Sequence, residues 1–230
     1  YERSVRLLAK SGRHAFIVML SLSFGDTYKS LRTFLRRAKR DEWWATFGRW
    51  PDGLFTGARV RNTILTMGPG RGSSHTTQHN IITARTKPWV FQNLEFSEAE
   101  VHGSAAPIRG GIAQDLATSI HKCPRTPEVG EAVVFVRPTA SYWFPALYEN
   151  PPVLDMNLSV IRAEDNGTMA VHLPMGFTST FGGSVLGTKL AYLYWQAIGD
   201  DFHVNAREIH PILSFVKSAA GSTELDSLGT

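Results

Sequence analysis

The segment from Leu54 to Leu65 holds side chains that could bind a flat ring next to negative charge. Phe55 precedes a turn marked by Gly57, and Arg59 and Arg61 follow with one residue between them. Residues two apart on a strand project from the same face, so both guanidinium groups could meet phosphates on one side. Two other interpretations stay open: Phe55 could be an anchor under a loop, and the arginines could decorate a solvated edge strand.

Other chemical signatures in the chain are weaker. His75 and His79 are four residues apart, a spacing that suits zinc on a helix. Residues 73–77 are poor helix formers, however, and no Glu stands between the histidines, so we expect no metal site. The sequence also lacks a G-x-G-x-x-G turn and a Walker-type lysine signature. Scattered Ser, His and Asp residues without a nucleophile elbow give a hydrolase triad no support.

Composition and charge favour a folded protein that could bind a polyanion. Of 230 residues, 43% are hydrophobic and 19% are charged, which is ordinary for a globular chain. The 24 Lys and Arg against 20 Asp and Glu give a net charge of +4. The stretch from residue 29 to residue 40 contains no acid and six cations: Lys29, Arg32, Arg36, Arg37, Lys39 and Arg40. A polyanionic partner is therefore permitted without being required.

Cysteine content and hydropathy bear on the compartment. Cys123 is the single cysteine, so no intramolecular disulfide can form, and we expect a reducing cytoplasm. The longest apolar run, Ala15 to Leu20, is too short to cross a bilayer, so we expect no membrane partner. Val5, Leu8 and Ala9 predict a helix at the start with no capping residue before it, which fits a piece cut from a longer polypeptide.

The first third of the chain predicts an α/β fold. The expected elements, in order, are a helix before Gly12, a strand buried on both faces at 14–20, a basic helix after Asp26, and strands at 43–47 and 60–67. A parallel αβα segment followed by an antiparallel pair forms the closing edge of a mixed, doubly wound sheet. The strand at 14–20 should expose an unpaired edge unless a partner supplies the next strand.

The remainder predicts a second region after the flexible loop Gly68 to Ser74. We assign 1–68 to the sheet, 69–105 to a connecting segment, 106–217 to an α+β region and 218–230 to a disordered tail. Within the third part we expect a helix after Ala106, a strand at 132–136, a hairpin joining 158–162 to 169–173 through Asn166-Gly167, and a helix at 186–198.

These pieces together resemble the later motifs of adenine-specific DNA methyltransferases of restriction-modification systems. The resemblance rests on residues 12–23, on the segment 54–65, in which Ala58 replaces the usual Val, and on Thr76-Thr77. Residues 137–143 and 186–205 resemble the recognition region of the same enzymes, with Gly187-Thr188 where Asn-Ser is usual. The resemblance extends, with gaps, from about Tyr1 to Ile212, and the motifs occur in the order found in the family.

The resemblance implies that the chain contains the C-terminal edge of a Rossmann-like mixed sheet, followed by an α+β target-recognition region. It also implies double-stranded DNA as the partner. Enzymes of this family rotate the target adenine out of the duplex, and Phe55 matches the residue that stacks on it. The expected DNA contacts are Arg32, Arg36, Arg40, Arg59, Arg61, Arg71, Thr76, Thr77 and Arg137.

The resemblance also implies S-adenosylmethionine as methyl donor for the full-length enzyme, held by an N-terminal half of the same polypeptide that this chain lacks. We expect the chain alone to bind no donor and to be inactive, and we name no catalytic residue. Asn150-Pro151-Pro152 resembles the catalytic loop only superficially, because Val153 cannot stack and the segment follows Phe55 instead of preceding it. A type IIG system, with a fused nuclease, fits the pattern.

A function of another class remains open. The chain could be a non-enzymatic DNA-binding specificity module that acts with a separate catalytic subunit. That hypothesis keeps the basic helix and the recognition region but has no use for Phe55 as a base clamp.

Overall fold

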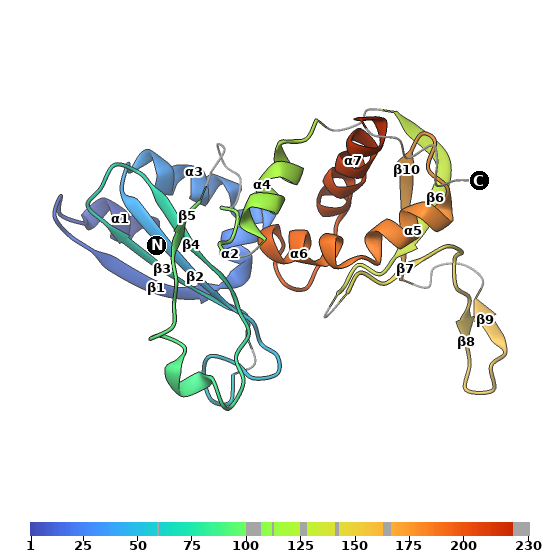
Figure 1. Cartoon of the computed structure of the whole chain (residues 1–230). Helices are drawn as coiled ribbons and strands as arrows, with labels where there is room; N and C mark the ends of the chain where they lie inside the picture. Colours follow the sequence, from blue (N-terminus) through green and yellow to red (C-terminus); the bar gives the residue numbers. More distant parts are fainter. Residues whose placement is uncertain are drawn as a thin grey trace. The chain divides into compact units, whose positions relative to one another are not determined.

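The computed structural model describes residues 1–58, 60–99, 107–111, 113–124, 128–140, 143–162 and 167–222 (Figure 1). The chain forms two compact units. Unit 1 comprises Tyr1–Thr118 and Gln196–Asp201, and unit 2 comprises Ser119–Trp195 and Phe202–Thr230. A short segment from the last third of the chain therefore folds with the first half.

Unit 1 is built on a mixed sheet, which confirms the predicted α/β class. Its strands are β1 (His14–Met19), β2 (Asp41–Phe47), β3 (Asn62–Gly68), β4 (Ser74–Asn80) and β5 (Ser97–Glu98). Their order is β1-β3-β2-β4-β5. Strand β3 runs antiparallel to both of its neighbours, whereas β2 and β4 are parallel. Strands β1 and β2 thus point the same way with an antiparallel strand between them.

Each face of this sheet has its own core. Helices α1 (Glu2–Leu7) and α3 (Lys29–Arg37) cover one face, where Val5 and Leu35 pack with Trp44, Leu65 and Met67. Helix α2 (Leu20–Phe24) and the short 3-10 turn η1 (Asp26–Tyr28) link β1 to α3. On the opposite face, loops and the turn η2 (Lys87–Trp89) surround a smaller core of Ala45, Phe47, Leu54 and Ile82.

Strand β1 is less buried than the sequence predicts. Its residues alternate between half-buried and exposed, and Ile17 and Met19 are 53% and 57% exposed. The expectation of burial on both faces is wrong because β1 is an edge strand in the described structure and nothing covers its second face. Among the described residues, β3 is the only strand that pairs with β1. The expected open edge is thus present in the part of the chain that the structure describes.

Unit 2 combines a small sheet with helices. Strands β6 (Val129–Val136), β7 (Ala146–Leu147) and β10 (Met169–Pro174) form a sheet in the order β10-β6-β7. Helix α5 (Ser179–Leu186) contacts β6, and α7 (Ala206–Ser222) contacts β10. Helices α4 (Gln114–Lys122) and α6 (Lys189–Ile198) each run from one unit into the other.

The predicted hairpin between 158–162 and 169–173 is wrong. Strand β9 (Val160–Arg162) pairs with β8 (Val153–Leu154), and β10 pairs with β6. Asp155 supplies the physical reason, because its Oδ1 accepts hydrogen bonds from the backbone N–H groups of Asn157 (2.8 Å) and Ser159 (2.9 Å). This local turn folds β9 back onto β8. Residues 163–166, which include the expected Asn166 turn, lie outside the described residues.

Two further elements differ from the prediction. The expected helix at 186–198 is found as α6, but it begins only at Lys189, since α5 ends at Leu186 and Thr188 Oγ1 accepts a hydrogen bond from the N–H of Ala191, as a helix N-cap does. Helix α7 continues to Ser222, into the segment expected to be a tail, and residues 223–230 lie outside the described residues. Among the described helices, none combines the length and apolar character needed to span a membrane.

Candidate functional site

Phe55 lies in the loop between β2 and β3, at the end of the sheet where β1 and β2 terminate. Its backbone carbonyl accepts a hydrogen bond of 3.3 Å from the N–H of Ala58, and Gly57 supports the turn with φ of 79°. The preceding Leu54 is buried in the second core, whereas the Phe55 residue is 41% exposed. The loop is therefore anchored while the Phe55 ring remains accessible. Base stacking by Phe55 stays a prediction.

Arg61 immediately precedes β3 and forms an ion pair inside unit 1. Its Nε donates to Oδ2 of Asp201 over 2.9 Å, and the two side chains are only 15% and 16% exposed. Arg59, its expected partner at a DNA phosphate, lies outside the described residues. The Arg61 guanidinium thus has an internal acceptor close to the Phe55 loop, and its contact with DNA stays a prediction.

Asp201 also contacts His79 on β4. His79 Nε2 lies 3.3 Å from the same Oδ2 of Asp201, and the histidine side chain is 4% exposed. Asp201 has a positive φ of 63°, a conformation that is uncommon for a residue other than glycine. The carboxylate therefore joins the residue before β3 to strand β4 through one oxygen atom.

Arg109 holds the segment that carries Asp201. Its guanidinium donates to the backbone carbonyls of Gln196 and Gly199, the latter over 2.6 Å. The same group lies over the ring of Phe24, 3.9 Å from the ring centroid. Since Arg109 is 1% exposed, these contacts take the place of water around its charge.

Burial and mutual charge set the protonation of this cluster. Burial opposes the ionised form of Asp201, but the hydrogen bond from His79 and the charges of His79, Arg109 and Arg61 hold its pKa below the usual value. Burial, followed by repulsion from Arg109, lowers the pKa of His79 despite the pull of Asp201. Burial lowers the pKa of Arg109 to about 10. At neutral pH the cluster therefore holds a carboxylate, a neutral imidazole and two guanidinium ions.

The three arginines predicted to bind DNA from the basic stretch make internal contacts. Arg32 is 2% exposed and donates to the carbonyls of Leu22 and Gly25, over 3.0 and 2.8 Å. Arg40 donates to the carbonyls of Gly12 (3.0 Å) and Ala9 (2.6 Å) after helix α1. Arg36 is half-buried, and burial lowers its pKa while Glu42 opposes the shift. Their DNA contacts stay predictions.

Thr76 and Thr77 are both fully buried on β4. The hydroxyl of Thr76 donates to the carbonyl of Ile108 over 2.9 Å, and that of Thr77 donates to the carbonyl of Gln78 over 2.8 Å. The Thr76 hydroxyl thus holds the segment at Ile108 onto the sheet, whereas the Thr77 bond is local. DNA contact by Thr76 and Thr77 stays a prediction.

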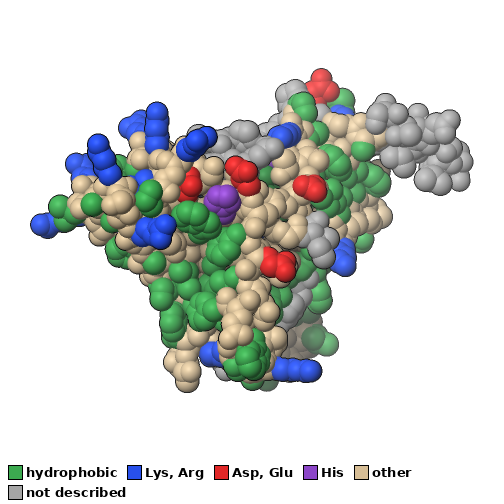
Figure 2. Space-filling model, turned by 60° about the vertical axis from the view of Figure 1, so that its left-hand side comes forward, with side chains coloured by type: hydrophobic (Ala, Val, Ile, Leu, Met, Phe, Trp, Pro, Cys, Tyr) green, Lys and Arg blue, Asp and Glu red, His purple; other side chains and the backbone are tan. Residues whose placement is uncertain are grey.

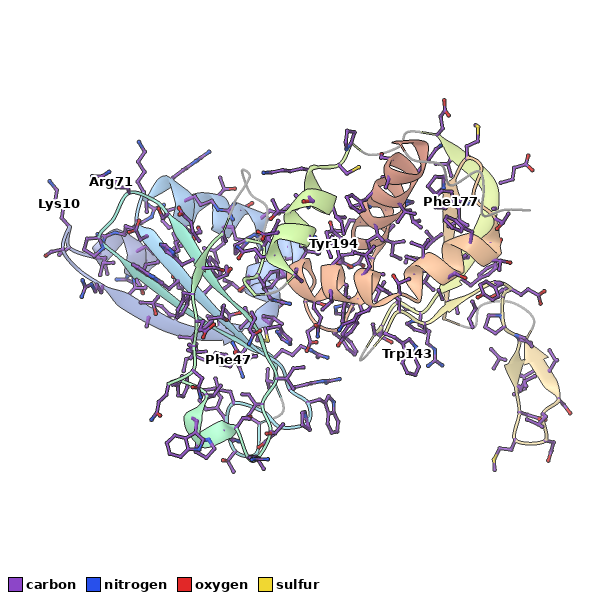
Figure 3. All side chains as sticks on the ribbon, in the orientation of Figure 1. Lys10, Phe47, Arg71, Trp143, Phe177 and Tyr194 are labelled. Carbon is purple, nitrogen blue, oxygen red and sulfur yellow. The ribbon has the colours of Figure 1, made fainter. Side chains whose placement is uncertain are left out.

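Arg71 is exposed but lies at the other end of the sheet from Phe55. Arg71 follows β3, whereas Phe55 precedes β3. The seven residues of this strand span roughly 20 Å. Figure 3 places Arg71 and Lys10 at the same end of unit 1, and Figure 2 shows Lys and Arg side chains gathered on that side. Arg71 and Phe55 therefore cannot contact the same nucleotide. Arg137, in unit 2, is exposed at the end of β6.

The sequence did not identify the cluster of Asp201, His79 and Arg109. In the sequence, His79 is a rejected zinc ligand that stands two residues after Thr77 of the resemblance, and Asp201 falls within the segment 186–205 that resembles a recognition region. Among the described residues, no group of three or more His, Cys, Asp or Glu side chains could hold a metal ion. Asp201 contacts residues as distant in the sequence as Arg61, 140 positions earlier, so no local spacing reveals the cluster.

Comparison with known proteins adds little. No family model matches the sequence, and no curated protein matches it. Solved structures include similar chains, one of which is described as "cryoEM structure DrdV-DNA complex". That likeness has a TM-score of 0.37 at 13% identity and covers 44% of this chain and 12% of the other. This chain spans a small part of that neighbour, and a likeness of this degree carries no argument about function.

Proposed function

We propose that this chain supplies the base-contacting and DNA-contacting part of a site-specific methyltransferase, which moves a methyl group from S-adenosylmethionine to adenine N6 in DNA. The observation that carries the proposal is the position of Phe55. The residue is 41% exposed, on an anchored loop, at the end of the sheet where β1 and β2, which run in the same direction, terminate. Ligands of open α/β sheets bind at this end of the strands.

A flipped base requires a flat apolar surface because it has lost its stacking neighbours in the duplex. A phenylalanine ring offers such a surface, and base-aromatic stacking contributes about 1 to 3 kcal/mol per base. The Arg61–Asp201 pair, 2.9 Å long, lies a few residues after the loop and restrains the chain where β3 begins. This restraint supports a fixed position for the Phe55 ring.

We further propose that the donor-binding half of the enzyme adds strands at the open edge of β1. Exposed Ile17 and Met19 would become buried by such an addition. The described residues offer no cradle for the donor, since β1 continues directly into α2 without a glycine-rich turn. No step of methyl transfer is therefore assigned to a residue of this chain.

The alternative, a non-enzymatic DNA-binding specificity module, draws support from one observation. The Arg137 residue is exposed in unit 2, away from the Phe55 loop in sequence, so DNA could be bound without any flipped base. This alternative predicts that loss of the Phe55 ring leaves DNA binding unchanged.

Methyl transfer by the complete gene product tests the proposal. The protein would be incubated with methyl-labelled S-adenosylmethionine and bacterial DNA that lacks adenine methylation, and N6-methyladenine would be measured by mass spectrometry. We expect incorporation by the wild type and a loss of about tenfold or more for Phe55→Ala, from the stacking term. Phe96→Ala is the matched control, because Phe96 is 42% exposed in the same unit.

Two results would contradict the proposal. If the complete protein forms no N6-methyladenine but binds the DNA, the specificity module is the better account. If Phe55→Ala and Phe96→Ala both retain wild-type methylation, the ring of Phe55 does not hold the base.

A further inference from the structure

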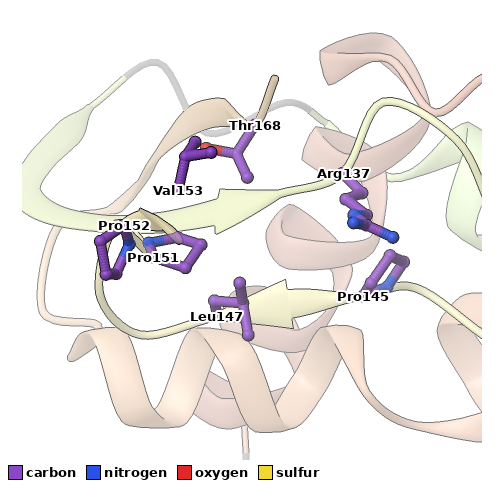
Figure 4. A pocket seen from close by; sticks show the side chains of 7 residues that line it. All are labelled: Arg137, Pro145, Leu147, Pro151, Pro152, Val153 and Thr168. Carbon is purple, nitrogen blue, oxygen red and sulfur yellow. The ribbon is translucent and has the colours of Figure 1, made fainter. Parts of the chain in front are cut away.

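Unit 2 contains a cavity of about 480 Å³ beside the end of β6. Leu147 and Pro145 line one side of it, and Pro151, Pro152 and Val153 line another (Figure 4). The lining also includes the side chains of Arg137 and Thr168. Its volume falls within the range of small-molecule sites in proteins, roughly 300 to 1,000 Å³.

Backbone contacts of unit 2 fix the walls of this cavity. The N–H of Arg137 donates to the carbonyl of Pro145 over 3.1 Å, which holds the end of β6 against the start of β7. Strands β6 and β7 pair through Phe135 and Leu147. The hydroxyl of Thr168 donates to Oδ1 of Asn150 over 3.2 Å, so the segment before β10 lies against the segment that enters Pro151. The cavity is thus built from several strands and not from one loop.

The lining dictates the chemistry of a ligand. Proline rings and aliphatic side chains form apolar walls suited to the face of a flat ring. Arg137 is an exposed residue, and among the described residues its guanidinium has no hydrogen-bonding or ionic partner. An unpaired guanidinium binds phosphate or carboxylate oxygens in a bidentate manner. A ligand that fits must therefore carry a flat apolar body next to an anionic group.

We propose that this cavity binds one nucleotide, with the base against the proline and aliphatic walls and the 5′-phosphate at Arg137. The identity of the ligand rests on the proposed function, because DNA is the partner that supplies such a unit. The site is separate from Phe55, which belongs to unit 1. The nucleotide could come from an unstacked position in a DNA strand or from the free pool, and the experiment distinguishes the two sources.

Fluorescence of 2-aminopurine tests the site in the 230-residue chain. One probe is a single-stranded oligothymidylate with one central 2-aminopurine, and the other is free 2-aminopurine deoxynucleoside 5′-monophosphate. Arg137→Gln removes the cation, Val153→Trp fills the cavity, and Lys189→Gln is the control that removes an exposed cation elsewhere in unit 2. Circular dichroism establishes that each variant is folded.

We expect saturable binding that weakens about tenfold or more in Arg137→Gln, as a lost charged hydrogen bond implies, and to a similar degree in Val153→Trp, with Lys189→Gln close to wild type. If Val153→Trp does not fold, the probe affinities of Arg137→Gln and Lys189→Gln are compared instead, and only Arg137→Gln should bind more weakly. Tighter binding of the oligonucleotide identifies a strand as the source, and tighter binding of the monophosphate identifies the free nucleotide.

Three results would overturn the proposal: no binding of either probe, equal weakening by Arg137→Gln and Lys189→Gln, or equally tight competition by an aromatic carboxylate such as benzoylglycine. Failure here is separable from failure of the proposed function. Methylation by the complete protein with no binding at this cavity rejects only the nucleotide site, whereas binding here without any methylation rejects only the methyltransferase.

Discussion

Arg61 and Asp201 are 140 residues apart in the sequence, and their side chains form a hydrogen-bonded ion pair of 2.9 Å. The carboxylate of Asp201 is shared with His79, and the backbone of its segment is held by Arg109. A short stretch from late in the chain is therefore part of the sheet unit that carries Phe55. The unit that holds the Phe55 loop therefore combines residues from the first half and the last third of the sequence.

Replacing Asp201 with Asn should destabilise the protein. The substitution removes the negative charge opposite the guanidinium of Arg61 in a site where both side chains are only 15% and 16% exposed. Loss of a hydrogen bond between charged groups costs about 1.5 to 3 kcal/mol in the free energy of unfolding. Chemical denaturation measures this cost.

Glu2→Gln is the control for the Asp201 experiment. Glu2 pairs with Arg6 on helix α1, but those side chains are 53% and 67% exposed. Loss of such a surface pair changes stability by about 0.5 kcal/mol or less. Equal effects of the two substitutions would refute the structural role of Asp201.

His79 should make stability depend on pH. Burial lowers its pKa in the folded protein below 6.5, so the unfolded chain takes up a proton first as the pH falls. The stabilisation is complete above pH 6.5 and is lost as the pH drops toward the folded pKa. The wild type should lose about 1 kcal/mol more than His79→Gln between pH 6.5 and 5.5. Denaturation curves that stay parallel across this interval would contradict the assignment.

The open edge of β1 should promote self-association of the isolated chain. Ile17 is 53% exposed on β1, an edge strand of the described sheet, and a charge there opposes edge-to-edge pairing. Ile17→Lys should therefore reduce aggregation in light scattering after gel filtration, at little cost in stability. Leu7→Lys is the control, since Leu7 is 76% exposed on helix α1. An equal gain from both substitutions would mean that added charge, and not the strand edge, matters.

Arg37 and Arg32, on the same helix, should behave differently toward DNA. Arg37 is exposed with no side-chain partner among the described residues, so Arg37→Gln should lower the salt dependence of binding to random duplex DNA by about one unit of log-log slope. Arg32→Gln removes the donor to two backbone carbonyls and should destabilise the fold by about 1 to 3 kcal/mol. Fluorescence anisotropy across a salt series measures the slope, and an unchanged slope for Arg37→Gln would indicate a solvated helix.

Local signals predicted the main elements of unit 1. Apolar residues at three-residue and four-residue steps located α3, and the Gly57 turn before an apolar strand located β3. The apolar run at 14–20 did not reveal whether the strand lies at the edge or in the middle of the sheet, because strands in both positions can be equally apolar. The hairpin prediction failed because Asn166-Gly167 is a strong local signal, whereas the side-chain turn at Asp155 depends on hydrogen bonds that a turn-residue pattern does not specify.

The candidate site was only partly predictable. Phe55 could be found because it stands two residues before the turn glycine Gly57 in the sequence. The internal contacts of Arg32 could not be predicted from the sequence. Its acceptors are the backbone carbonyls of Leu22 and Gly25, and every residue type has such a carbonyl. For the same reason a run of cations does not reveal which of its members face water.

The most direct test of the account is the environment of the target base. A duplex that contains the recognition site would carry 2-aminopurine at the target adenine, and its fluorescence would be measured with the complete protein. We expect a rise as the base leaves the stack, an altered signal and weaker binding in Phe55→Ala, and wild-type behaviour in Phe96→Ala. No fluorescence change with the wild type, or identical signals from all three proteins, would contradict a role for Phe55 in receiving the base.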